Sequence, residues 1–370
     1  MKITATKEKL LKSIQLAEDI ITSKNTISIL SNILLETTEN GLIITSTDLD
    51  VAIKSNIEAK IIEEGSITVF AKTFSDFIRA LPNDDIEITV DNEKMVHIKS
   101  KNEQVKIDFN IIGIPKNDYP VLPKVEKENI FTIPQSVLKS LIRKTIFSVS
   151  KDEAGVAISG IKLELKDKRL RFASTDARRL SLMDYSVDTD INIENAIIPQ
   201  KVLAELLKIL TDEGNVDISV SSNQIYFKID NIELVSKLID GKFPDYTQVI
   251  PTNFEKKVVL YTKQFYNAVN RVSLLFKDKA KAKVTCKFNN NRLELLSIDP
   301  EIGNAKEEID TPYDYEPYEI AFNSEFLLDA IKAIDTEKFV LGLNKNTEAA
   351  LIKEENNEDY LSLIMPIRLS

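Results

Sequence analysis

Hydrophobic and polar positions repeat along the chain with a period of one third of its length. Three alternating segments each end in an aspartate: residues 41–48, 169–176 and 292–299. The aspartates are 128 and 123 residues apart, and one third of the 370 residues is about 123. Apolar residues at every second position predict strands with one buried face. Recurrence at a fixed period indicates three copies of one structural unit.

Two amphipathic helices accompany each alternating strand. Apolar residues three or four apart predict helices over residues 7–24, 71–80, 135–151, 199–213, 262–283 and 322–334. A short strand precedes each helix, and a hairpin-like pair of strands closes each third of the chain. Many strands with only two helices per third predict an α+β fold, in which helices cover one face of antiparallel sheets.

Two connectors rich in proline and aromatic residues separate the thirds of the chain. They span residues 117–123 and 243–251. Such segments mark domain boundaries, which we place near 125 and 253. The predicted domains are residues 1–125, 126–253 and 254–370.

The rarest residue types exclude most familiar enzyme chemistry. The chain has 9 glycines, one cysteine (Cys286) and one histidine (His97). Gly155 and Gly160 have the spacing of a phosphate-binding loop, but Ile161 stands where that loop requires lysine. One cysteine permits neither an internal disulfide nor a multi-cysteine metal site. His97 lies in an alternating stretch typical of a strand. We therefore expect no catalytic residues, metal or cofactor.

Targeting and membrane segments are not evident in the sequence. The first 16 residues contain four lysines and lack the continuous apolar stretch of a signal peptide. No uncharged apolar segment approaches the roughly 20 residues that a membrane span needs. We expect a cytoplasmic protein without a membrane partner.

The net charge of -10 is unevenly distributed. The six predicted helices carry 19 lysines and arginines against 10 aspartates and glutamates, so the strands and loops are strongly acidic. A charged helix face is usually only a solvated surface. Several basic helices in one repeated unit favour a shared positive surface instead, which would suit the phosphates of DNA. The last helix, with Glu325 and Asp329, departs from this pattern.

Three motifs follow one another in the second and third thirds of the chain. They are Ala-Ser-Thr-Asp-Ala-Arg-Arg-Leu at 173–180, Asp-Gly-Lys-Phe-Pro-Asp-Tyr at 240–246 and Met-Pro-Ile-Arg-Leu at 365–369. Together with the threefold repeat, they resemble the bacterial DNA sliding clamp, the β subunit of DNA polymerase III. The resemblance implies a homodimeric ring of six domains that encircles duplex DNA without sequence specificity. Such a ring tethers the replicative polymerase and confers processivity, catalyses no reaction, and associates with the nucleoid during replication.

The resemblance also implies which residues face DNA and which join two copies. Helices line the hole of the ring, so the candidate DNA-facing residues are basic residues on the predicted helices: Lys24, Arg79, Lys139, Arg143, Lys201, Lys208, Lys263 and Arg271. At the dimer interface, Val105 and Ile107 of the first domain would meet Leu274 and Leu275 of the third. These four residues could equally belong to the cores of their own domains.

A hydrophobic groove between the second and third domains is the other implied site. It would bind short peptides of the polymerase III catalytic subunit, the clamp loader and other proteins with a clamp-binding motif. Its expected lining is Ile158, Thr175, Ala177, Arg178, Arg179, Leu180, Pro244, Val249, Thr347, Leu363, Ile364, Met365, Pro366, Ile367 and Arg368.

Some groove positions depart from the family pattern or allow another interpretation. Ala177 and Arg178 stand where the family commonly has glycine followed by histidine or an aromatic residue, which leaves the peptide preference open. Ser370 extends past the usual end and could alter the groove's edge. Either Leu363 or Ile364 could be a core residue instead.

Two other functions compete with the clamp. A repeat-built interaction scaffold would bind proteins without encircling DNA. An enzyme would use Asp48, Asp176 and Asp299 as a metal or acid/base cluster. Aspartate favours turns, and equivalent positions of separate domains lie far apart, so we expect these three to be turn residues.

Overall fold

The computed structural model describes residues 1–21, 27–102, 106–120, 129–151, 156–278 and 282–369. The chain forms two compact units: Met1–Ser136 with Ala204–Leu238, and Val137–Leu203 with Ile239–Ser370. The division passes through helices α3 (Gln135–Thr145) and α4 (Gln200–Ile209) of the predicted second domain. The boundary predicted at residue 125 lies outside the described residues.

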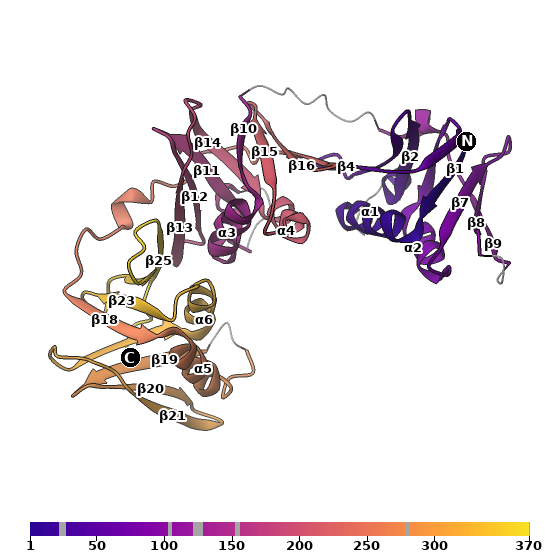
Figure 1. Cartoon of the computed structure of the whole chain (residues 1–370). Helices are drawn as coiled ribbons and strands as arrows, with labels where there is room; N and C mark the ends of the chain where they lie inside the picture. The colour runs from indigo at the N-terminus through magenta and orange to yellow at the C-terminus, as the bar shows by residue number, and fades with distance from the viewer. Residues whose placement is uncertain (22–26, 103–105, 121–128, 152–155, 279–281, 370) are drawn as a thin grey trace. The chain divides into compact units, whose positions relative to one another are not determined.

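The first unit contains two antiparallel sheets and the helices α1 (Lys7–Ile20) and α2 (Ala71–Ala80), which pack together (Figure 1). One sheet has the order β5 (Lys60–Glu63), β1 (Lys2–Thr6), β7 (Asp85–Val90), β8 (Met95–Ser100), β9 (Asp108–Ile112). The other has the order β10 (Phe131–Pro134), β15 (Asn215–Val220), β16 (Gln224–Ile229), β17 (Ile232–Lys237), β4 (Val51–Ile57), β3 (Gly41–Thr47), β2 (Asn32–Thr38), β6 (Ser66–Phe70).

The second unit repeats this plan with α5 (Thr262–Ser273) packed beside α6 (Ser324–Lys332) (Figure 1). Its larger sheet has the order β14 (Ile193–Pro199), β11 (Gly160–Lys166), β12 (Arg169–Thr175), β13 (Arg179–Ser186), β25 (Tyr360–Ile364), β24 (Ala350–Glu354), β23 (Lys338–Leu343), β18 (Lys256–Tyr261). Its smaller sheet has the order β21 (Gly303–Asp310), β20 (Arg292–Asp299), β19 (Lys283–Asn289), β22 (Tyr318–Asn323).

Each eight-stranded sheet is shared between neighbouring predicted domains. In the first unit β17 pairs antiparallel with β4, with Leu234 opposite Ile53. In the second unit β13 pairs antiparallel with β25, with Leu182 opposite Leu361. Main-chain hydrogen bonds therefore hold the thirds of the chain together, in addition to side-chain packing.

The six predicted helices are present, but several end earlier than predicted. Helix α3 ends at Thr145, whose hydroxyl donates to the Leu141 carbonyl oxygen at 2.6 Å, and a short 3-10 turn follows. Helix α5 ends at Ser273, ten residues before the predicted limit of 283, where β19 begins. The apolar residues Leu275 and Phe276, three and four positions after Val272, continue the helical spacing in sequence, although the helix has already ended.

The three repeated aspartates have the same structural role. In each, Oδ1 accepts two main-chain N–H groups of the following turn: Asp48 from Asp50 and Val51, Asp176 from Arg178 and Arg179, Asp299 from Glu301 and Ile302. Aspartate suits this position because its short carboxylate bonds to the local backbone. These contacts agree with the prediction of turn residues and give no support to an acid/base cluster.

The single cysteine and the single histidine both lie in places that suit a structural role. Cys286 is completely buried in the core of the third domain, and burial raises the pKa of its thiol to about 12. His97 lies on β8 and makes hydrogen bonds with Asp91 and Asn110, which raise its pKa. Within the described residues, none of the helices combines the length and apolar character needed to cross a membrane.

Candidate peptide groove and basic helix surface

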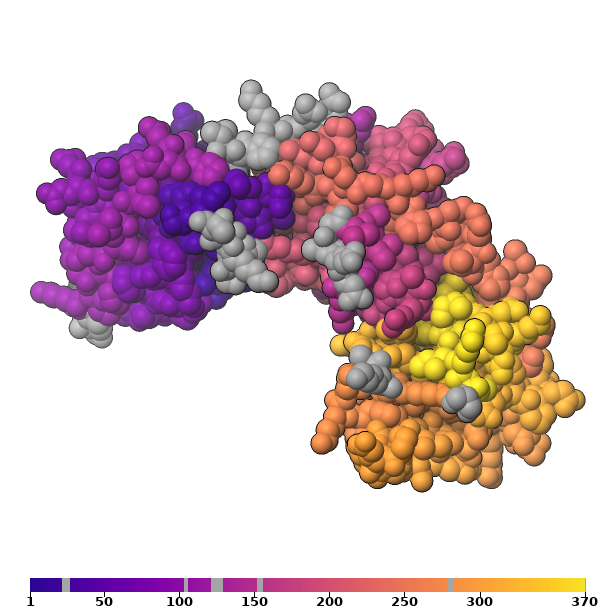
Figure 2. All heavy atoms as spheres, turned by 180° about the vertical axis from the view of Figure 1, so that it is seen from behind, coloured from indigo at the N-terminus to yellow at the C-terminus, as the bar shows by residue number. Residues whose placement is uncertain are grey.

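A small hollow of about 80 Å³ lies in the second unit, beside the junction of β13 and β25. Its lining contains eight of the predicted groove residues and one that was not predicted, Ala349. The lining residues are Thr175, Ala177, Arg178, Arg179, Leu180, Val249, Ala349, Leu363 and Met365. The C-terminal residues (yellow) contribute to the surface of this unit in Figure 2.

Strand pairing explains which apolar residues line the hollow. Leu180 on β13 lies directly opposite Leu363 on β25, and both line it. Successive side chains of a strand point to opposite faces. Ile364, the next residue, is therefore fully buried in the core of the third domain and does not line the hollow. Both residues are buried in hydrophobic clusters, Leu363 with Leu180 and Ile364 in the core of the third domain, but only Leu363 also lines the hollow.

Six other predicted groove residues do not line the hollow. The Ile158 carbonyl oxygen accepts a hydrogen bond from the Ser150 amide, and Ile367 forms an isolated bridge with Ala321. The remaining four are Pro244, Thr347, Pro366 and Arg368. Ser370 lies outside the described residues. Sequence reasoning missed Ala349, which directly precedes β24 and has no distinguishing local signal.

The turn at the hollow's edge holds a non-glycine residue in a left-handed conformation. Ala177 has φ 68°, and its N–H donates to the Thr175 hydroxyl oxygen at 3.1 Å. The first unit contains the same arrangement, where Leu49 has φ 77° and its N–H donates to the Thr47 hydroxyl oxygen. A side chain in this conformation costs about 1–2 kcal/mol, since Cβ approaches the following carbonyl oxygen.

Ala177→Gly is expected to stabilise the protein by about 0.5–1 kcal/mol. Relief of the left-handed strain exceeds the extra backbone entropy that glycine brings to the unfolded chain. The urea midpoint of unfolding measures the change. Leu49→Gly tests the same backbone conformation in the first unit, although it also removes a larger side chain. A lower midpoint for Ala177→Gly would show that the Ala177 methyl group contributes more than the strain costs.

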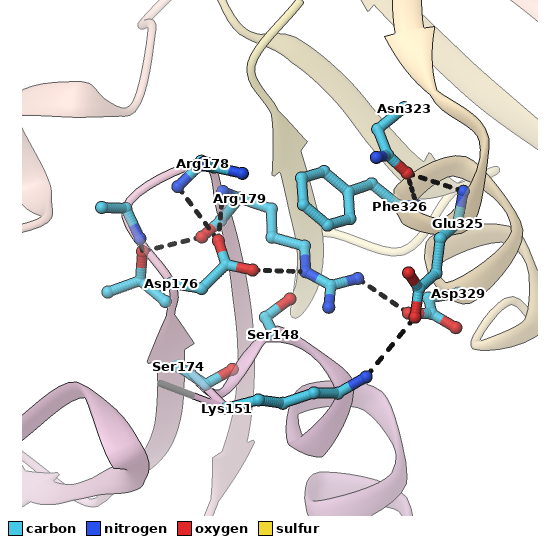
Figure 3. A network of polar contacts seen from close by, with 12 residues as sticks. Ser148, Lys151, Ser174, Asp176, Arg178, Arg179, Asn323, Glu325, Phe326 and Asp329 are labelled. Atoms are coloured by element: carbon cyan, nitrogen blue, oxygen red, sulfur yellow. Dashed lines mark hydrogen bonds and ion pairs between the residues drawn. The ribbon is translucent and has the colours of Figure 1, made fainter. Parts of the chain in front are cut away.

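Arg179 connects this turn to the third domain (Figure 3). Its side chain is 3% exposed; Nε donates to Asp176 at 2.9 Å, and a terminal nitrogen donates to Asp329 on α6 at 2.8 Å. The guanidinium carbon lies 4.3 Å from the centre of the Phe326 ring. Asn323 caps the same helix by accepting the amide N–H groups of Glu325 and Phe326. Arg179 thus joins the groove's turn to Phe326 and Asp329 of α6.

A second buried cation joins the same two domains. The Lys144 side chain on α3 is 3% exposed and donates a hydrogen bond to Glu354, which is 5% exposed. Its Nζ lies 3.2 Å from Asp335 and 4.8 Å from the centre of the Tyr360 ring. Burial acts to raise the pKa of Glu354, but hydrogen bonds from Lys144, the Asp335 amide and Asn357 outweigh it, so the pKa is lowered.

The structure places acidic residues beside several of the predicted DNA-facing residues. Four have acidic partners within the chain: Arg79 with Asp76, Arg143 with Asp335, Lys208 with Asp19 and Glu205, and Arg271 with Glu307. Lys139 and Lys201 are half-buried on α3 and α4, Lys263 is exposed on α5, and Lys24 lies outside the described residues. Sequence reasoning assigned the four paired residues a free positive charge, because their partners are not evident from the sequence.

The residues predicted at the dimer interface lie in different units. Leu274 follows α5 and is 68% exposed, whereas Leu275 and Ile107 are half-buried. Val105 lies outside the described residues. The rings of Phe77 on α2 and Phe109 on the edge strand β9 stack with centres 4.4 Å apart.

Comparisons with known proteins match one family along nearly the whole chain. Models of the N-terminal, central and C-terminal domains of the DNA polymerase III beta subunit match residues 1–123, 132–245 and 247–368. A beta sliding clamp of Staphylococcus aureus is 32% identical over 359 residues, covering 94% of each chain. The DNA polymerase sliding clamp of Bacillus subtilis is 32% identical, with a TM-score of 0.94 and complete coverage of both chains.

A sliding clamp of Pseudomonas aeruginosa that was crystallised bound to griselimycin is also 32% identical over both complete chains, with a TM-score of 0.93. The chain belongs to the DNA polymerase III beta subunit family, the bacterial sliding clamps. This confirms the predicted family and the α+β fold of three clamp domains. Sliding clamps are non-catalytic processivity factors, which confirms the predicted class of function.

Proposed function

We propose that two copies of this chain close a ring around duplex DNA and tether the replicative polymerase to its template. Agreement with sliding clamps over the complete chain is the observation that carries the proposal. We assign residues 1–125, 126–253 and 254–370 to its three domains. Its partners would be the polymerase III catalytic subunit, the clamp loader and other proteins with a clamp-binding motif, whose peptides would bind in the hollow beside β13 and β25. It would act in the cytoplasm, associated with the nucleoid during replication.

Ring closure would join β9 of one copy to β21 of the other. Each strand has a hydrogen-bonded neighbour on only one side among the described residues. Pairing two such edges would satisfy their free main-chain groups. The half-buried Phe77 and Phe109 near β9 and the exposed Leu274 near the end of α5 provide apolar surface for the same interface. Ile107, directly before β9, would lie at its margin.

DNA contact would come from basic residues on the helices. Over their observed bounds the six helices carry 13 lysines and arginines against 7 aspartates and glutamates, so they remain net basic. Exposed ion pairs such as that of Arg79 with Asp76 are weak, and phosphates could exchange with the carboxylates. Such contacts carry no sequence information, which suits a protein that slides.

Topological retention on DNA tests the proposal. The protein is loaded onto a nicked circular plasmid with the clamp loader and ATP, and the bound fraction is then separated by gel filtration. Linearising the plasmid is expected to release nearly all of the protein, because a ring slides off free ends. Continued retention on linear DNA would contradict encirclement. Failure to load while peptides still bind would favour the scaffold alternative.

A further inference from the structure

The rim of the hollow carries a positive charge that the chain itself does not neutralise. Two of the nine lining residues are arginines, Arg178 and Arg179, and none of the nine is acidic. Arg178 is exposed, whereas Arg179 is buried. The two charges are therefore available to a bound peptide to very different degrees.

The charge of Arg179 is already satisfied. Its guanidinium bonds to Asp176 and Asp329 and lies against the Phe326 ring. These contacts fix its position within the junction of the second and third domains (Figure 3). A peptide carboxylate would have to displace a carboxylate of the chain to bind there.

Both carboxylate oxygens of Asp176, the nearest acidic residue in the sequence, also accept hydrogen bonds from the chain. Its Oδ1 accepts the amide N–H groups of Arg178 and Arg179, each at 3.0 Å, and its Oδ2 accepts Nε of Arg179 at 2.9 Å. Arg178 therefore contacts Asp176 through its main chain. In the described part of the chain, no carboxylate lies within ion-pair distance of the Arg178 guanidinium.

We propose that this groove selects peptides in which a carboxylate flanks bulky aliphatic side chains. The inference rests on the proposed peptide-binding function of the groove. Among the lining residues, Val249 and Met365 are 57% and 45% exposed and provide the apolar surface for the aliphatic side chains, whereas Leu180 and Leu363 are buried. Arg178 at the rim provides a planar fork of N–H donors, which matches the geometry of a carboxylate. Apolar contact thus provides most of the affinity, and Arg178 selects peptides that have an acidic residue beside the aliphatic ones.

Matched peptides test this selection. The probes are fluorescein-labelled octapeptides with two adjacent leucines and a single glutamate at each of the four nearest flanking positions in turn. Every glutamate peptide has a glutamine counterpart. Fluorescence anisotropy with the full chain is expected to show at least one glutamate peptide binding about three- to ten-fold more tightly than its counterpart, a difference that salt reduces.

Substitutions at Arg178 assign the effect to its side chain. In Arg178→Gln the preference for glutamate is expected to disappear, while affinity for the glutamine peptides stays within about two-fold. The exposed side chain can change without loss of the turn, since Asp176 bonds to the main chain of residue 178. The matched control is Arg292→Gln on β20, outside the hollow, which should retain the preference.

The experiment distinguishes failure of the acidic preference from failure of peptide binding itself. If the glutamine peptides bind but no glutamate peptide binds more tightly, the acidic preference is overturned and the groove remains a peptide site. If neither series binds at any position, the proposed function of the groove fails, and this inference fails with it. If Arg178→Gln still prefers the glutamate peptides, another residue binds the carboxylate, and the assignment to Arg178 is overturned.

Discussion

Replacing Lys144 by methionine is expected to lower the free energy of unfolding of the second unit by about 3–5 kcal/mol. The substitution preserves much of the side-chain volume but leaves Glu354, which is 5% exposed, without its cation. Removing one member of a buried ion pair costs this much because the remaining charge stays desolvated. Hydrogen exchange during urea titration measures the loss, which should be concentrated in α3, β24 and β25.

The pH dependence gives this prediction a second readout. Burial opposes ionisation of Glu354, but its hydrogen bonds hold the pKa below the ordinary value of 4.5. A lowered pKa contributes stability above pH 4.5, and that contribution is lost as the pH falls through the folded-state value. In Lys144→Met, burial should instead raise the pKa of Glu354. The difference in stability between the two proteins should therefore shrink as the pH falls from 6 to 3.

A pair whose acidic partner is exposed provides the control, with its lysine on the same strand as Glu354. Lys353 and Glu358 form an ion pair in which Glu358 is 84% exposed. Lys353→Met should cost less than about 1 kcal/mol, since water screens such pairs. Lys144→Met with Glu354→Gln should recover part of the loss, because the amide is neutral and still accepts the Asp335 N–H. Equal costs for Lys144→Met and Lys353→Met would contradict the buried-pair interpretation.

Arg179→Met is expected to destabilise the junction of the second and third domains by about 2–4 kcal/mol. The loss should lie somewhat below that for a fully buried pair, because Asp329 is 32% exposed and water can hydrate it. The turn that forms the rim of the hollow would also lose its connection to α6. Peptide affinity should then fall roughly ten-fold, equivalent to about 1.4 kcal/mol.

Arg179→Lys separates the charge from the geometry. Lysine retains the charge but cannot bond to Asp176 and Asp329 in a planar fork or stack on Phe326 in the same way. We expect intermediate stability and a peptide affinity closer to that of Arg179→Met. Anisotropy titration at a temperature where all variants remain folded measures the affinity. Full peptide binding by Arg179→Met would show that the rim does not depend on this connection.

Local patterns predicted the repeated elements well. Strand alternation and helical spacing are properties of a few consecutive residues, and the turn role of Asp176 follows from short-range hydrogen bonding. The end of α5 was placed wrongly for a related reason. Leu275 and Phe276 continue the apolar spacing of the helix, but the pattern does not encode where the helix ends before β19.

The electrostatics could not be predicted from local patterns. Lys144 resembles any other lysine of a basic helix, and its partner Glu354 lies 210 residues away in sequence. Arg143 likewise meets Asp335 at a separation of 192 residues. Most of the hollow's lining was identified through the family resemblance. Only the register of β13 on β25 distinguishes Leu363, which lines the hollow, from Ile364 in the core.

The shared eight-stranded sheets limit how this protein can be dissected. A third domain produced alone would carry β25 without β13, and a first domain alone would carry β4 without β17. Each fragment would present a row of unpaired main-chain groups beside apolar side chains, which is a template for aggregation. Poor solution behaviour of such a fragment would therefore reflect its exposed sheet edge, and would say little about the stability of the same domain in the intact chain.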